Sequence, residues 1–355
     1  MLNKMDIYKI DSHKLVYHLD RLYDWYKGKD IYPLYIEISP WGGCNQRCIF
    51  CALDFLGYKP HFLGIKVLKK FLKDIAGAGV KSIMFAGEGE PLIYKDIAEA
   101  ITYAKGRGLD VALTTNGVFL NEKFLKEAFS SLSWLRVSFN APTPRKYSFI
   151  HGTKKEDFYR ATENIKKAVI LKKKKKLSTV LGVQFLLLEE NAKDIGKMIK
   201  LSKSLGVDYL IIKPYSYHPK SKNYLKVNYK KFLSLGKRIS KYEDKKFKII
   251  FRERAILSLV NRRIYKRCLG LSFWAYLSSD GSLYACSSFL GDKRFIYGNI
   301  YKESFKKIWR SEKRREIIKT MQDWDTKKCR SACRLEQINN FLWEIKNPPP
   351  HKNFI

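Results

Sequence analysis

The chain has 355 residues, a formal net charge of +35 and an apolar content of 45%, a composition typical of a folded protein and not of a disordered one. No apolar stretch approaches the ~18 residues that would cross a membrane, and charges interrupt the segment from Met1 to Lys14, so we expect a cytoplasmic protein without a signal peptide or a membrane partner. The positive charge favours nucleic acid or phosphorylated partners, although lysines that merely coat helices would give the same value.

Six short β-branched runs alternate with amphipathic, helix-length stretches in the first two thirds of the chain. Strands are predicted at 35–38, 82–85, 111–114, 134–139, 180–187 and 209–212, and helices near 65–79, 94–106, 121–131, 156–172 and 192–205. Strands that alternate with helices form right-handed βαβ units around a parallel sheet. Six units are fewer than the eight of a closed barrel, so we predict the α/β class with a partial (β/α)6 TIM-like barrel.

The remaining sequence suggests four further regions. We predict an N-terminal extension (1–33), the barrel (34–225), a basic, helix-like linker (226–265), a small cysteine-containing domain (266–341) and a tail (342–355). Within the linker, 248–251 is a candidate for one further strand. In the small domain, Asp280-Gly281 between apolar runs predicts a β-hairpin, and a helix is expected from Glu303 to Met321.

Polar and glycine-rich segments follow the predicted strands, where parallel barrels carry their active sites. The Cys44 loop follows the first strand, Gly87–Pro91 the second and Thr114–Gly117 the third, and Ser138 and Asn140 end the fourth. Weaker candidates, for which surface charge or packing is the alternative, are Lys213, Tyr215, Tyr217, His218, Arg252 and Arg254. His151 is expected to be structural or exposed and not a catalytic base.

An odd number of cysteines, seven, argues against a disulfide framework and for metal or cluster ligation. Cys44, Cys48 and Cys51 have the spacing C-x3-C-x2-C. Three thiolates on one loop can bind a [4Fe–4S] cluster and leave one iron open. A zinc site completed elsewhere, with His61 nearest in sequence, is the alternative, but zinc modules usually pair two ligands with two more.

The other four cysteines, Cys268, Cys286, Cys329 and Cys333, are spaced C-x17-C-x42-C-x3-C. The predicted hairpin would bring Cys268 and Cys286 together, and a helix leads to the last pair. Four thiolates would saturate one auxiliary [4Fe–4S] cluster or one zinc ion, and the spacing leaves both open.

The cysteine loop after the first strand resembles the signature of the radical S-adenosylmethionine (SAM) superfamily. Gly87-Glu88-Gly89-Glu90-Pro91 resembles its glycine–glutamate motif, and Thr114–Gly117 and 137–140 resemble its third and fourth strand ends. The resemblance covers about residues 34–213. It implies that Cys44, Cys48 and Cys51 hold the catalytic cluster and that SAM is bound by Phe50, Gly87, Gly89, Glu90, Thr114, Asn116, Ser138 and Asn140. For Phe50, an ordinary packed aromatic is an equal alternative.

The segments Gly281–Cys286, Gly298–Ile300 and Cys329–Arg334 resemble the SPASM and twitch extensions, which carry auxiliary clusters. Four cysteines match the shorter twitch form, closest to that of 2-deoxy-scyllo-inosamine dehydrogenase. The resemblance implies an auxiliary [4Fe–4S] cluster in electron transfer. It also implies an oxidoreductase that cleaves SAM to a 5′-deoxyadenosyl radical and takes hydrogen from a sugar, cyclitol or nucleotide conjugate. Ferredoxin or flavodoxin would supply electrons, and peptide or RNA modification are the alternatives.

Overall fold

The computed structural model describes residues 6–321 and 323–354, and in them ten strands form one sheet. The strands are β1 (Tyr35–Ile38), β2 (Ser82–Phe85), β3 (Asp110–Thr115), β4 (Trp134–Ser138), β5 (Val180–Leu187), β6 (Tyr209–Pro214), β7 (Lys248–Phe251), β8 (Trp274–Leu277), β9 (Ser282–Tyr284) and β10 (Ile296–Asn299). Their order in the sheet is β10-β9-β8-β1-β2-β3-β4-β5-β6-β7. Neighbours from β8 to β7 are parallel, whereas the β8–β9 and β9–β10 pairs are antiparallel.

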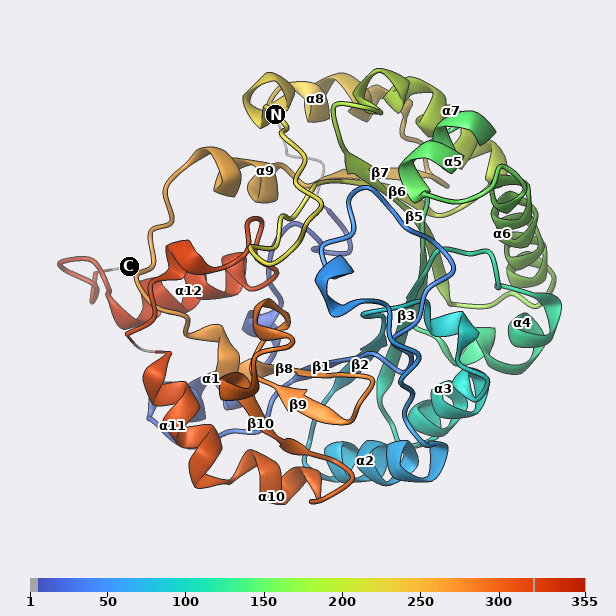
Figure 1. Cartoon of the computed structure of the whole chain (residues 1–355). Helices are drawn as coiled ribbons and strands as arrows, with labels where there is room; N and C mark the ends of the chain where they lie inside the picture. The colour runs from blue at the N-terminus through green and yellow to red at the C-terminus, as the bar shows by residue number, and fades with distance from the viewer. Residues whose placement is uncertain (1–5, 322, 355) are drawn as a thin grey trace.

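Helices line the outer side of this curved sheet, as Figure 1 shows for α2, α3, α4, α6 and α7. The helices are α1 (Leu19–Tyr26), α2 (Ile65–Gly77), α3 (Ile97–Gly106), α4 (Glu122–Ala128), α5 (Pro144–His151), α6 (Glu156–Lys174), α7 (Ile195–Leu205), α8 (Leu235–Ile239), α9 (Glu253–Val260), α10 (Phe305–Trp309), α11 (Glu312–Thr320) and α12 (Glu336–Lys346). None of the helices in the described part of the chain has the length and apolar character that crossing a membrane requires.

The predicted α/β class and its six parallel strands are confirmed, and the sheet extends further than predicted. β7 adds a parallel strand inside the basic linker region, at the candidate strand 248–251. β8 pairs with the other edge of β1, so the sheet continues into the cysteine-rich region. The sheet therefore crosses the predicted boundaries at 225 and 266, whose positions stay a prediction.

One helix prediction was wrong in detail, and one helix was not predicted. The stretch from Glu303 to Met321 forms two helices, because Ser304 and Ser311 each accept a hydrogen bond from a backbone N–H and so start a new helix. Helix α5 was not predicted, although Pro144 at its start and Gly152 after its end are typical helix boundaries.

The two faces of the sheet carry different side chains, because successive strand residues point to opposite sides. Ile36, Ile38 and the equivalent residues of the other strands pack against the helices in the main core. On the concave face, Met84, Ala86 and Ala112 form one small cluster, and residues of β6 and β7 form another with Tyr8 and Ile10. The concave face also carries most of the unusual polar residues of the chain.

Candidate active site

The cysteine loop starts directly after β1 and is held in place by three other segments; Figure 1 shows it (blue) crossing the middle of the fold. The N–H of Glu90 donates to the carbonyl of Gly43 (2.9 Å). The N–H groups of Arg47 and Ile49 donate to the C-terminal end of α5. Beyond β6, the Ser221 hydroxyl donates to the carbonyl of Cys51 (3.1 Å). These contacts fix the loop at the C-terminal edge of the parallel strands, as predicted.

Glycines in the second motif are needed because the cysteine loop lies against it. A Cβ on Gly89 would lie 1.9 Å from the carbonyl oxygen of Gly43. Gly87 has a φ of +134°, and a Cβ there would lie 2.4 Å from the Ser39 hydroxyl. The glycines thus allow two backbones to touch.

The three thiols of this loop are unbonded and lie close enough to affect one another's charge. Burial, together with the neighbouring thiols, raises the pKa of Cys48 well above its ordinary value, and burial raises the pKa of Cys44 to about 12. The N–H of Gln46 donates to the Cys44 sulfur (3.5 Å). Soft thiolate donors gathered on one loop fit an iron–sulfur cluster, and a bound iron would favour the thiolate forms.

His151 lies next to this loop and contacts it through Gln46. It is buried, and burial lowers its pKa to about 3, so the ring is neutral. Its Nδ1 lies 2.9 Å from Gln46 Oε1, and its Nε2 accepts from the N–H of Asn140 (3.1 Å). The imidazole therefore links the cysteine loop to the end of β4, in agreement with a structural role.

Glu90 and Asn140 are fully engaged with the protein itself. The Glu90 carboxylate accepts from the Thr115 hydroxyl (2.6 Å) and the N–H of Asn116 (2.8 Å). The Asn140 side-chain oxygen accepts from the N–H of Leu186 (2.7 Å). Both residues tie neighbouring strand ends together, and their predicted roles toward SAM stay predictions.

The other predicted SAM residues surround the same edge. Asn116 donates to the Asn45 side chain within the cysteine loop (2.7 Å), and Ser138 lies next to Gln184 on the concave face. Thr114 contacts Met84, and Phe50 packs edge-on against His151 with ring centroids 5.6 Å apart. The fold thus brings all predicted residues to one edge, and which of them touch SAM stays a prediction.

Three segments supply the second thiol set: the chain after α9, the end of β9 and the loop before α12. Burial raises the pKa of all four thiols, and the charges of Cys268 and Cys286 are among the further causes for Cys333. The Asn339 amide donates to Cys268 (3.5 Å), and the N–H of Ser288 donates to Cys286 (3.5 Å). The four cysteines therefore lie close enough for their charges to act on one another, and their shared role as cluster ligands stays a prediction.

Two contacts join the barrel to the cysteine-rich C-terminal region, and they bring the two thiol sets to the same side of the molecule. His218 stacks on Phe55 of the cysteine loop (4.5 Å between centroids) and lies 3.2 Å from the carbonyl of Ser288. The Glu88 carboxylate accepts from the hydroxyl (2.7 Å) and N–H (3.3 Å) of Ser279, which follows β8. Burial raises the pKa of Glu88 to about 7. Neither contact was predicted, since each joins residues far apart in sequence.

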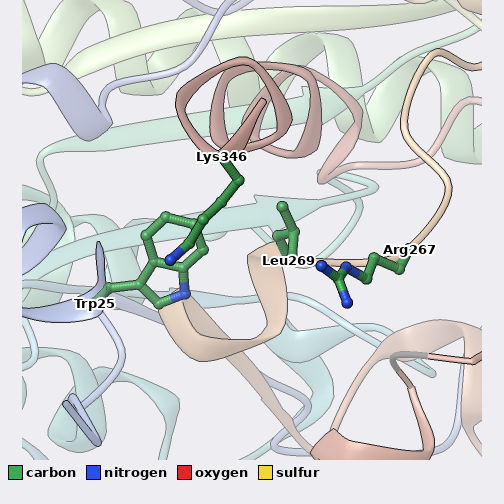
Figure 2. Close-up of a pocket in the computed structure, with 4 residues that line it drawn as sticks. All are labelled: Trp25, Arg267, Leu269 and Lys346. Atoms are coloured by element: carbon green, nitrogen blue, oxygen red, sulfur yellow. The ribbon is translucent and has the colours of Figure 1, made fainter. Parts of the chain in front are cut away.

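A separate pocket lies between α1 and α12, lined by Trp25, Arg267, Leu269 and Lys346 (Figure 2). Lys346 Nζ lies 5.1 Å from the centroid of the Trp25 ring. None of the predicted site residues lines this pocket.

Comparison with known families agrees with this geometry. Residues 38–234, more than half of the chain, match the family model described as "Radical SAM superfamily". The chain belongs to the radical SAM superfamily. Residues 268–334 match a second model, SPASM, described as an iron–sulfur cluster-binding domain. The two domains imply [4Fe–4S] clusters and SAM as cofactors, and they identify the protein as an enzyme, as predicted.

Three curated relatives bear names of nucleotide enzymes. A GTP 3′,8-cyclase of Aquifex aeolicus is 30% identical over 306 residues, which cover 79% of this chain and 90% of that protein. A probable GTP 3′,8-cyclase of Methanocaldococcus jannaschii is 32% identical over 52% of this chain and 59% of its own. A SAM-dependent nucleotide dehydratase of Lacinutrix mariniflava is 38% identical over 30% of this chain, and the match spans only 23% of that relative.

A solved structure shares the whole fold. Streptococcus suis SuiB bound to SAM superposes with a TM-score of 0.69 over 95% of this chain and 80% of its own, at 16% identity. At this identity the likeness concerns the fold alone.

The SPASM match favours iron for the second thiol set, where spacing had left zinc open. Within residues 6–321 and 323–354, no group of three or more His, Cys, Asp or Glu side chains is arranged to hold one metal ion.

Proposed function

We propose that this enzyme uses SAM to abstract a hydrogen atom from a small-molecule substrate, namely a sugar, cyclitol or nucleotide conjugate. The main support is the packing of the cysteine loop on the Gly87–Pro91 motif through the bond from Glu90 to Gly43. When bound, the reduced cluster and SAM supply a 5′-deoxyadenosyl radical, which becomes 5′-deoxyadenosine when it takes a hydrogen atom from the substrate. Cys44, Cys48 and Cys51 would hold that cluster with one iron left for SAM.

The second thiol set supports a role in electron transfer. Cys268, Cys286, Cys329 and Cys333 would fill all four ligand positions of a cluster, which leaves no iron for direct binding of substrate. A ferredoxin- or flavodoxin-type donor is the proposed source of electrons.

Anaerobic reconstitution tests the proposal. We expect about eight irons per chain, an EPR signal that SAM perturbs, and release of 5′-deoxyadenosine after reduction. Stoichiometric zinc with little iron after reconstitution would contradict it.

Peptide modification is the second candidate, because SuiB has also been solved bound to its precursor peptide SuiA. The two candidates differ in what stimulates SAM cleavage. Small phosphorylated compounds should raise 5′-deoxyadenosine release above the substrate-free rate, whereas a peptide enzyme would respond to peptides alone.

A further inference from the structure

Five cationic side chains from four segments gather on the concave side of the sheet. They are Arg136 on β4, Lys213 on β6, Arg252 directly after β7, and Arg330 and Arg334 in the loop of the second thiol set. Arg136 alternates along its strand with residues of the outer core, and so does Lys213, which places both side chains on the concave face.

These cations lie close enough to repel one another. Burial lowers the pKa of Lys213 well below its ordinary value, and the charges of all four arginines add to this effect. Burial also lowers the pKa of Arg252, and Arg136 and Arg334 act in the same direction. Such crowding destabilises the folded protein unless an anion is present.

Carboxylates balance only part of this charge. Arg334 pairs with Glu37, and Arg252 pairs with Asp11 at 3.3 Å. The other three cations have no ion-pair partner among the residues that the structure describes. Arg330 donates a hydrogen bond to Ser216, and Arg136 donates one to the Tyr209 hydroxyl. Lys213 makes no side-chain hydrogen bond within the same described residues. Two of the five cations are thus paired with carboxylates, and the thiols of Cys286 and Cys333 lie near enough for their charges to act on Arg330.

These charges are partly open to solvent. The Arg334 side chain is 47% exposed, and the other four residues are partly exposed. Guanidinium groups bind phosphate oxygens in pairs, and a lysine adds a compact charge. Three cations without a carboxylate partner in one place match a diphosphate or triphosphate better than a single carboxylate.

We propose that Arg136, Lys213, Arg252, Arg330 and Arg334 bind the polyphosphate of a nucleoside diphosphate or triphosphate, or of its sugar conjugate. This inference rests on the proposed function and deepens it by naming the substrate class. Arg330 and Arg334 are next to Cys329 and Cys333, so the loop of the second thiol set would also position the substrate phosphates.

Calorimetric titration of the reconstituted protein, under anaerobic conditions, tests the site directly. Inorganic pyrophosphate, GDP and UDP should bind, whereas guanosine and uridine should not. Lys213→Met should weaken pyrophosphate binding about ten-fold, since it removes one of the three cations without a carboxylate partner. The control Arg160→Gln, on the exposed face of α6, removes the same charge elsewhere and should change the affinity less than about two-fold.

Glu37→Gln is expected to increase the affinity for pyrophosphate, whereas misfolding would decrease it. Removing the carboxylate that pairs with Arg334 should tighten pyrophosphate binding about three-fold or more. The proposal is overturned if pyrophosphate does not bind, if Lys213→Met and Arg160→Gln weaken it equally, or if a single-stranded RNA competes as well as GDP does.

Measuring pyrophosphate binding and SAM cleavage separately distinguishes this site from the radical chemistry. Substrate-free release of 5′-deoxyadenosine in the control Arg160→Gln should equal that of the wild type. Pyrophosphate binding without SAM cleavage in the wild type would remove the proposed function and leave the anion site, whereas cleavage without anion binding would remove only the site.

Discussion

The two thiol sets are built by different means. Cys44, Cys48 and Cys51 lie within eight residues on one loop, and the rest of the fold only fixes where that loop sits. The second set is assembled from distant segments, which meet because β8 joins β1 and the loop before α12 bonds to Ser216 and Tyr217. A local ligand set can form before the fold is complete, whereas the second set depends on the tertiary structure and should in turn stabilise it.

The largest effect is expected from removing the first thiol set, Cys44, Cys48 and Cys51. A Cys44/Cys48/Cys51→Ala variant should keep about four of about eight irons and lose release of 5′-deoxyadenosine altogether, because no iron remains for SAM. Iron and sulfide analysis with chromatographic detection of 5′-deoxyadenosine would measure this. Retention of SAM cleavage would show that another cluster binds SAM.

Removing ligands of the second thiol set should mainly lower the stability of the folded protein. A Cys329→Ser/Cys333→Ser variant should also lose about half its iron, but its melting temperature should fall by about 5–10 °C and below that of the triple alanine variant. SAM cleavage without substrate should persist. Calorimetry on both variants gives the comparison, and equal melting temperatures would mean that the second set does not hold its segments together.

Much of this organisation could be read from the sequence. Strands such as Tyr35–Ile38 were predicted at their observed bounds, because short β-branched runs bounded by loops are a local signal. β7 was interpreted only as a possible strand, since its neighbours Lys245, Lys246 and Lys248 resemble the surface of a helix.

The polar environment of the site could not be predicted in the same way. His151 gave no signal of its link to Gln46, because the two lie 105 residues apart. Arg136 and Arg334 resemble surface charges in a chain with 69 basic residues, and only the fold turns them toward the same space. Long-range burial and pairing decide such roles, and single-sequence patterns do not contain them.

A single added methyl group should disrupt the packing of the cysteine loop on the Gly87–Pro91 motif. Gly89→Ala would place Cβ 1.9 Å from the carbonyl oxygen of Gly43, so the loop must shift. We expect a loss of about 1–3 kcal/mol in stability and roughly ten-fold weaker SAM binding, measured by urea unfolding and calorimetry. Gly196→Ala, on α7 with open space around its Cβ, is the matched control and should be neutral or slightly stabilising. A similar loss in both variants would refute the packing argument.

The smallest effect concerns the contact that joins the two regions, between Glu88 and Ser279. Burial raises the pKa of Glu88 to about 7, and the hydrogen bonds from Ser279 oppose this shift only in part. The folded protein therefore holds this proton more tightly than the unfolded chain, whose value is near 4.5, so stability is lost as the pH rises from about 4.5 to about 7.

Glu88→Gln should remove this loss, because a neutral amide keeps the contact to Ser279 without a buried charge. Relative to the wild type, the variant should gain about 2 kcal/mol in the free energy of unfolding at pH 8 and almost nothing at pH 4. Urea unfolding at the two pH values measures the difference, with the exposed Glu127→Gln on α4 as the control that should change little at either. An equal effect of Glu88→Gln at both pH values would mean that the carboxylate holds the two regions together through its hydrogen bonds and that its protonation plays no part.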